Sequence, residues 1–279
     1  MALEDRIPFG MSLPHRSPDP IDMLAVRQVA ERADALGFRD LWVTENALDH
    51  VFSFDPMVIL TYAAAVTTSI RLGVAVAVLP VHHPARVAHQ VATLDYVSHG
   101  RATLGVGLGR EHHYAEFQVP TDRRVRRFRE GIELIKALWT EPKVSYRGSI
   151  FQVEGGTMML KPVQKPHPPI WLGGDHPDAV RRAATMGDGW MGSGGSSVAV
   201  FARSVPTLRA ELHRWFTTVY HNPAGTDASG VHGTPEQVRE RLEELIAMGA
   251  NHLLLNPICR YAEHVDALAA VVGLAAGRK

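Results

Sequence analysis

The chain has 279 residues, of which 46% are hydrophobic and 21% are charged, an ordinary composition for a soluble globular protein and a length that α/β barrels often take as one domain. Its 29 basic and 29 acidic residues balance, so no overall field attracts nucleic acid or an anionic membrane. A single cysteine, Cys259, excludes an internal disulfide and indicates a reducing compartment.

The start of the chain and its hydrophobic runs bear on where the protein resides. The first residues include acids where a signal peptide needs a basic region, and no apolar segment follows them. The longest apolar runs fall far short of the roughly 18 residues that a membrane span needs. We therefore expect a cytoplasmic protein that acts on a small molecule, without membrane or nucleic-acid partners.

The predicted elements alternate between short apolar strands and amphipathic helices. The expected strands cover residues 7–13, 41–43, 72–78, 102–106, 170–172, 189–191, 216–220 and 252–255. The expected helices cover residues 24–36, 56–66, 84–97, 125–139, 177–186, 198–214, 235–248 and 262–274. Eight strand–helix units with strands covered on both faces predict a (β/α)8 TIM barrel of the α/β class, as one domain over residues 1–279; an open doubly wound sheet is the alternative.

Residues 141–169 depart from this alternation. Apolar side chains recur at every second position around Gly148, and the paired glycines Gly155 and Gly156 follow. This pattern predicts a β-hairpin insertion between the fourth helix and the fifth strand.

The stretch after the fifth strand contains the first candidate binding site. Gly173 and Gly174 end the strand, and Pro177 suits the first turn of the next helix. Backbone N–H groups at such a helix start favour an anion, which here suggests a cofactor phosphate. The alternative is that the glycines only make a tight turn, and Asp175 and Asp178 favour it, because their carboxylates would repel a phosphate.

Glycine also follows the fourth and sixth expected strands. Residues 105–113 read GVGLGREHH, and residues 192–196 read GSGGS. Polar residues follow the first and second strands instead, at 14–16 and 44–50. Three glycine-rich exits on one rim would permit close approach by a large, flat, phosphate-bearing ligand.

At this point a family resemblance becomes definite. LGVAVAVLPVHHPARVAHQVATLDYVSHGRATLGVGLGR, over residues 72–110, and KPVQKPHPPIWLGGDHPDAVRRAATMGDGW, over 161–190, resemble the bacterial luciferase-like monooxygenase family of flavin and deazaflavin enzymes. The resemblance extends from the first strand to GTPEQVRERL near the end of the chain. It is closest to the branch that depends on the deazaflavin coenzyme F420, with FMN as the alternative cofactor.

This resemblance implies a barrel with an insertion after the fourth helix and a homodimer. It implies a non-prolyl cis peptide at Ala75–Val76 behind the deazaflavin, ring or ribityl contacts from residues 107–110, and a phosphate held at 173–174. The cofactor contacts that it implies are Glu45, Asn46, Ala75, Val76, Gly107, Leu108, Gly109, Arg110, Gly173 and Gly174.

One departure from the F420 branch limits the mechanism. That branch has an acid followed by histidine after the second strand, where this chain has Glu45 and Asn46. An amide does not titrate near neutral pH, so Asn46 cannot act as a general base. The acid that the branch carries in its fourth loop falls on Arg110, so dehydrogenation of a sugar phosphate is not expected. Glu45 is a candidate proton donor, a ring contact, or only the cap of the second helix.

The leading hypothesis is an oxidoreductase that passes hydride between reduced F420 and an organic substrate, with FMN-dependent monooxygenation as runner-up. Two other classes remain open: a protein that binds the cofactor without catalysis, and a metal-dependent hydrolase. The metal reading would use His82, His83, His112 and His113. Barrel hydrolases typically carry an H-x-H motif, which this sequence lacks, so no metal is expected.

Overall fold

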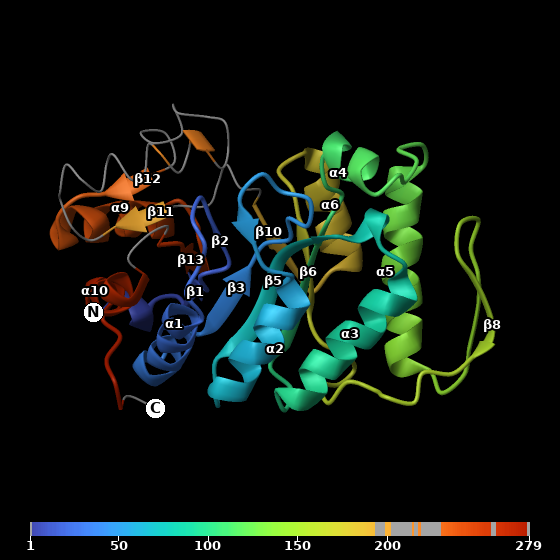
Figure 1. Cartoon of the computed structure of the whole chain (residues 1–279), viewed down its shortest axis with the longest axis horizontal. Helices are drawn as coiled ribbons and strands as arrows, with labels where there is room; N and C mark the ends of the chain where they lie inside the picture. The colour runs from blue at the N-terminus through green and yellow to red at the C-terminus, as the bar shows by residue number, and fades with distance from the viewer. Residues whose placement is uncertain are drawn as a thin grey trace. The chain divides into compact units, whose positions relative to one another are not determined.

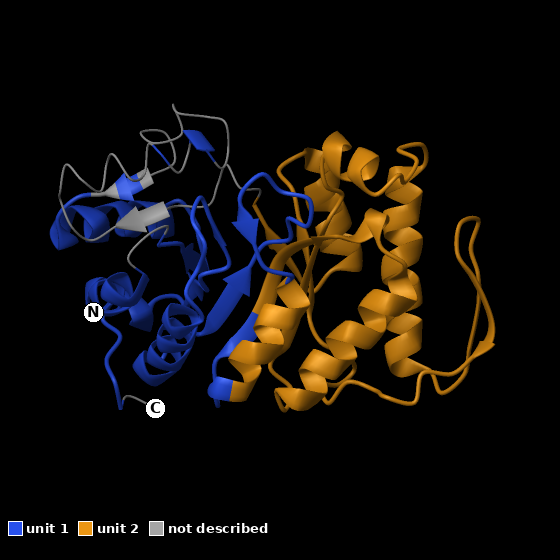
Figure 2. Cartoon of the chain, viewed as in Figure 1, with its two compact units in different colours: residues 1–55, 66–72, 194–279 blue, residues 56–65, 73–193 orange. Residues whose placement is uncertain are grey.

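The computed structural model describes residues 2–192, 199–201, 214, 217–218, 230–257 and 261–277. The chain divides into two compact units, coloured separately in Figure 2. Unit 1 comprises Met1–Asp55, Val66–Leu72 and Gly194–Lys279, and unit 2 comprises Pro56–Ala65 and Gly73–Ser193. The single domain over 1–279 stays a prediction, and Cys259 lies outside the described residues.

Unit 2 is built on parallel strands whose hydrogen-bonded order is β10-β9-β6-β5. Leu104 of β6 lies opposite Ile170 of β9, and Gly189 of β10 lies opposite Trp171 of β9. The strands are β5 (Arg71–Val78), β6 (Ala102–Gly107), β9 (Ile170–Gly173) and β10 (Gly189–Met191). The helices are α2 (Pro56–Val66), α3 (Pro84–Val97), α4 (Glu111–Glu116), α5 (Arg124–Thr140), α6 (Pro177–Met186) and the short 3₁₀ turn η2 (Leu79–Val81).

Helices α3 and α5 pack side by side in unit 2 (Figure 1). The apolar stripe of α5 is fully buried, and its Trp139 indole N–H donates to the carbonyl of Ala88 on α3 at 2.9 Å. The stripe follows the helical period, which is why the sequence predicted this helix to within a residue.

A two-stranded hairpin follows α5. Strands β7 (Val144–Arg147) and β8 (Gln152–Gly156) pair antiparallel, with Tyr146 opposite Val153. The buried carboxylate of Glu130 on α5 accepts hydrogen bonds from three successive backbone N–H groups of the hairpin turn, beginning with Ser149 at 3.0 Å. Burial alone would raise the pKa of Glu130, but these bonds outweigh it and lower the pKa. That the hairpin is an insertion into a barrel stays a prediction.

Unit 1 contains three parallel strands in the order β3-β1-β13. Met11 of β1 lies opposite Leu41 of β3 on one side and Leu255 of β13 on the other. The strands are β1 (Phe9–Ser12), β3 (Asp40–Val43) and β13 (Leu253–Leu255), with the pairs β2 (Arg16–Ser17)/β4 (Phe52–Ser53) and β11 (Ala199–Phe201)/β12 (Gly230–His232) beside them. The helices are η1 (Leu3–Asp5), α1 (Met23–Leu36), α9 (Pro235–Ala247) and α10 (Tyr261–Val272).

Local signals explain where the helices of unit 1 begin and end. The side chain of Asp22 caps α1, and Gly37 ends it in the left-handed region at φ 88°. Thr234 and Gln237 form a capping box at the start of α9. Helix α1 packs beside α10, where Arg32 pairs with Asp266 at 2.7 Å.

Two predictions in the C-terminal part of the chain are wrong. The helix expected over 198–214 is contradicted at Ala199–Phe201, which forms β11 and pairs in parallel with β12. The strand expected over 216–220 is contradicted at Thr217 and Thr218, which are helical. Periodicity does not separate a short apolar run into strand or helix, and tertiary pairing overrides local preference. The remaining residues of both segments, Arg214 excepted, lie outside the described residues.

The α/β class is confirmed by parallel strands and covering helices in both units. Among the described residues, no helix is long and apolar enough to cross a membrane.

Candidate functional site

The strand exits of unit 2 meet around Val76. The peptide between Ala75 and Val76 in β5 is cis, as the family resemblance implied. A Cβ built on Gly107, at the end of β6, would lie 2.6 Å from one methyl carbon of Val76. A Cβ on Gly173, at the end of β9, would lie 2.9 Å from the other methyl carbon. Both glycines therefore make room for the Val76 side chain, and the backbone at these two strand exits carries no other side chain at that point.

The loop after β6 is held by the short helix α4, which the sequence did not reveal. The hydroxyl of Tyr114 donates to the carbonyl of Leu108 at 2.5 Å. Gly109 takes a left-handed φ of 71°, and the N–H of Arg110 donates to the imidazole of His113 at 3.0 Å. The predicted contacts of residues 107–110 therefore lie together in one fixed turn.

The segment at Gly173 and Gly174 differs in one respect from its prediction. The N–H of Gly174 donates to the carbonyl of Met191 at 3.1 Å, so it is engaged within unit 2. At the start of α6, the imidazole of His176 accepts from the N–H of Asp178 at 3.2 Å. These contacts argue against a phosphate on the Gly174 N–H, although the role of the segment stays a prediction. Residues 193–196 of the third glycine-rich loop lie outside the described residues.

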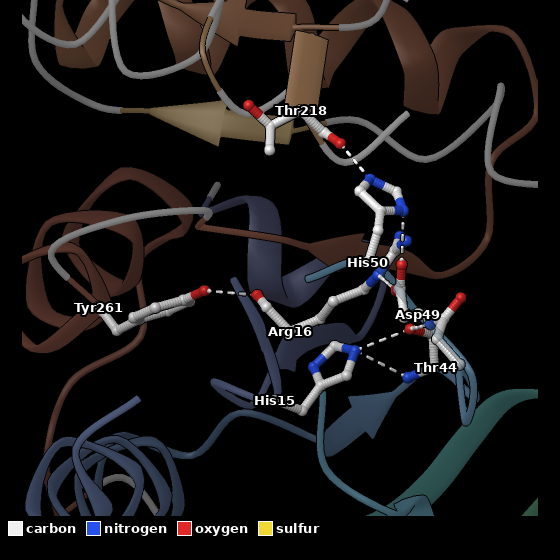
Figure 3. Close-up of polar contacts among 8 residues, drawn as sticks. His15, Arg16, Thr44, Asp49, His50, Thr218 and Tyr261 are labelled. Carbon is white, nitrogen blue, oxygen red and sulfur yellow. Dashed lines mark hydrogen bonds and ion pairs between the residues drawn. The ribbon is translucent and has the colours of Figure 1, made fainter. Parts of the chain in front are cut away.

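The strand exits of unit 1 carry a polar cluster, drawn in Figure 3. The loops after β1 and β3 are neighbours because the two strands pair in parallel. His15, buried after β1, contacts the carbonyl of Leu13 through Nδ1 at 2.6 Å. Its Nε2 lies 2.8 Å from the Thr44 hydroxyl and 2.9 Å from the Thr44 backbone nitrogen. Burial lowers the pKa of His15 to about 4, and the neighbouring charge of Arg16 adds to the effect.

A second group in the same loops is charged. Nε of Arg16 lies 2.6 Å from Asp49, and both side chains are nearly buried, with 11% and 7% exposed. Nδ1 of His50 lies 3.0 Å from the other oxygen of Asp49, and its Nε2 bonds to the carbonyl of Thr218. The hydroxyl of Tyr261 donates to the carbonyl of Arg16 at 3.4 Å (Figure 3).

The predicted contacts Glu45 and Asn46 are half-buried after β3 in unit 1. The amide nitrogen of Asn46 lies 2.8 Å from the Thr44 hydroxyl, which links it to His15. The other predicted cofactor contacts belong to unit 2, where Ala75, Val76, Gly107 and Gly173 are brought together.

The histidines considered for a metal site lie in pairs and contact rings. The ring centroids of His112 and His113 lie 4.0 Å apart. The imidazole of His83 packs edge-on against the ring of Phe151, with 5.6 Å between their centroids. His82 lies 6.1 Å from the ring of Phe117. In the described part of the chain, no three side chains gather that could hold a metal ion.

Comparison with known proteins supplies the family. A model described as "luciferase-like monooxygenase" matches residues 7–222. The chain belongs to the luciferase-like monooxygenase family. The resemblance seen in the sequence is therefore confirmed.

Named members of the luciferase-like family resemble this chain over most of its length. An F420-dependent glucose-6-phosphate dehydrogenase of Beutenbergia cavernae is 32% identical over 200 residues, covering 69% of this chain and 58% of its own. The chain spans about half of the length of the first curated relatives that it matches.

Solved structures share the fold. An F420-dependent secondary alcohol dehydrogenase with an F420–acetone adduct has a TM-score of 0.78 at 18% identity, covering 95% of this chain and 98% of that one. The FMN-bound oxygenating constituent of 3,6-diketocamphane monooxygenase from Pseudomonas putida has a TM-score of 0.73 at 15% identity, with the same coverage.

Sequence reasoning placed the residues of the unit 1 cluster at strand exits but did not connect them. Nothing in the spacing of His15 and Thr44 shows that their side chains meet. The only signal was that polar residues follow two neighbouring strands of a parallel sheet.

Proposed function

We propose that this luciferase-like protein is an oxidoreductase that uses coenzyme F420 to transfer hydride to or from a small organic substrate. The observation that carries the proposal is family membership together with relatives named as F420-dependent. The glycines at the exits of β6 and β9 support it as well, because positions without a Cβ permit close backbone approach by a flat ligand.

In the proposed reaction the cofactor supplies the hydride chemistry, and the chain binds, orients and excludes water. Val76, Gly107 and Gly173 would back the ring, and the turn of residues 107–110 would flank it. Asn46 would contact substrate or cofactor without exchanging a proton, since an amide does not titrate near neutral pH.

Three finer features are part of the same proposal. We infer a closed (β/α)8 barrel of one domain, in which the hairpin β7–β8 is an insertion between α5 and β9. The α/β fold shared with solved structures supports this inference. A homodimer is supported by the family resemblance alone, and a cytoplasmic location by the single cysteine.

The reaction is tested by mixing the protein anaerobically with reduced F420 and a panel of organic acceptors. We expect at least one acceptor to restore the absorbance of oxidised F420. No turnover across a broad panel, with tight F420 binding, would favour a non-catalytic binding protein.

Glucose 6-phosphate is expected not to be oxidised with F420. A general base contributes about 10²–10⁴-fold to proton transfer, and Asn46 cannot supply one. The rate should therefore lie at least about 100-fold below that of the Beutenbergia cavernae relative assayed beside it. Comparable rates for the two proteins would contradict this assignment of Asn46.

FMN-dependent monooxygenation is the second candidate, favoured by the FMN-bound structure that shares the fold. Its signature would be oxygen uptake that depends on reduced FMN and on an organic substrate. The deazaflavin has carbon at position 5 and behaves as a hydride carrier, so oxygen uptake with reduced F420 is not expected.

A further inference from the structure

Helix α4 of unit 2 spans only Glu111–Glu116, and one of its residues anchors it. A helix of this length is not stable on its own in water, so it depends on its packing. Tyr114 is the residue of α4 that is buried, with 1% of its surface exposed. The N–H of Val119 donates to the Tyr114 carbonyl at 2.9 Å, just after the helix. Tyr114 therefore determines where α4 lies.

The hydroxyl of this buried ring reaches back to the turn that precedes the helix. It donates to the carbonyl of Leu108 at 2.5 Å, the short end of the normal range for an O–H···O hydrogen bond. A carbonyl only accepts, so the phenol must keep its proton. Burial raises the pKa of Tyr114, and the charges of Arg124 and Arg127 offset only part of that rise. The phenol is therefore a neutral donor at physiological pH.

The turn of residues 107–110 contacts both α4 and β5. Gly109 has a left-handed φ of 71°, and a Cβ at this position would overlap a methyl carbon of Val78 in β5. The N–H of Arg110 donates to the imidazole of His113 at 3.0 Å, one residue before Tyr114. Two hydrogen bonds thus tie the turn to α4, while its glycine packs against β5.

We propose that Tyr114 is a positioning residue for the cofactor, whose hydroxyl holds the turn of residues 107–110 in the conformation that binds. The proposal rests on the proposed function, in which this turn flanks the ring. Because Tyr114 is buried, it presents almost no surface to a ligand and acts through the carbonyl of Leu108. A turn that is already held in its binding conformation loses less freedom when a ligand binds, so the hydroxyl raises the affinity.

The hold on the turn is tested by hydrogen exchange of the ¹⁵N-labelled full chain without cofactor. Tyr114→Phe removes one oxygen and keeps the buried ring. We expect the protection of the Arg110 amide to fall by about fivefold, the equivalent of one hydrogen bond. The amide of Gly148, which donates to the carbonyl of Phe151 in the hairpin, should keep its protection. Unchanged protection at Arg110, or an equal loss at Gly148, would overturn the proposal.

Tyr146→Phe is the matched control. Tyr146 lies on β7 of the same unit, and its hydroxyl donates to Glu133 on α5 at 2.8 Å. The control removes the same atom and the same kind of hydrogen bond, but outside the turn. The Arg110 amide should be as protected in Tyr146→Phe as in the wild type. An equal loss in both variants would contradict a specific role of Tyr114.

The effect on the cofactor is tested by fluorescence titration of the same three proteins with F420. The dissociation constant should rise about fivefold in Tyr114→Phe and stay unchanged in Tyr146→Phe. By linkage, saturating F420 should raise the protection of the Arg110 amide about fivefold more in Tyr114→Phe than in the wild type. A general loss of stability would not couple the ligand to this one turn. Equal affinities of Tyr114→Phe and the wild type would overturn the proposal.

Failure of the proposed function has a different signature. Wild-type protein that binds no F420 would overturn that function, and with it the role of the turn in binding the cofactor. The exchange experiment uses no cofactor, so it decides separately whether the Tyr114 hydroxyl holds the turn.

Discussion

Replacing Asp34 with alanine is expected to lower the free energy of unfolding by about 3 kcal/mol, because it leaves the donors of one turn, including the buried N–H of Ile70, without their acceptor. Asp34 lies near the end of α1, with 7% of its surface exposed. Its carboxylate accepts from the backbone N–H groups of Thr68, Ser69 and Ile70, and from two hydroxyls of the same turn. Urea unfolding at pH 7 measures the change.

The effect of Asp34 should also depend on pH. Burial alone would raise the pKa of Asp34, but the bonds from Ser69, Thr68 and Ile70 hold it well below its usual range. A lowered folded pKa means that the stabilisation is present above the unfolded value of about 3.9 and is lost as the pH falls below it. The difference between wild type and Asp34→Ala should therefore stay constant from pH 8 to about pH 5 and shrink below about pH 4.

A matched control lies on α10 of the same unit. Asp266 pairs with Arg32 at 2.7 Å, and its side chain is 53% exposed. Asp266→Ala should change the free energy of unfolding by no more than about 0.5 kcal/mol. Equal effects of the two substitutions would show that the bonds of Asp34 do not stabilise the turn.

Replacing Gly105 with alanine is expected to destabilise unit 2 by at least about 3 kcal/mol. A Cβ at this position in β6 would lie 2.1 Å from the backbone carbonyl oxygen of Val74 in β5. No rotation of a side chain relieves this contact, so the paired strands must separate. The expected result is a lower thermal midpoint or a loss of soluble protein.

Gly131 on α5 is the control for added volume. Its Cβ would lie 3.2 Å from a methyl carbon of Leu79, the end of a side chain, which needs to move by only a few tenths of an ångström. Alanine also favours a helix over glycine, so Gly131→Ala should change the stability by less than about 1 kcal/mol. A Gly105→Ala protein as stable as Gly131→Ala would contradict the close approach of β5 and β6.

Local sequence signals predicted the elements of the fold that carry their own caps or periodicity. Pro177 at the start of α6 and Gly37 after α1 are such signals, and both helices end within a residue or so of their predictions. Strand β11 has no such signal, because its partner β12 follows only after an intervening stretch of chain. A pairing of this kind depends on tertiary structure, which a local window does not contain.

Part of the candidate site could likewise be predicted from the sequence, and part depends on tertiary structure. The glycine exits and the Ala75–Val76 segment were found through a family resemblance. Gly107 and Gly173 both make room for Val76. This contact depends on how β5, β6 and β9 lie beside one another, which the sequence does not contain. The contacts that link His15, Thr44 and Asn46 likewise depend on distances between the loops that follow two different strands.

The central claim is that the chain binds F420, and a fluorescence titration of the purified protein with F420 and separately with FMN tests it most directly. Saturable binding of F420 at about micromolar concentration or tighter, with weaker binding of FMN, is the result predicted for a deazaflavin oxidoreductase. Preference for FMN would contradict the hydride-transfer proposal in favour of monooxygenation, and binding of neither would remove the cofactor site from unit 2.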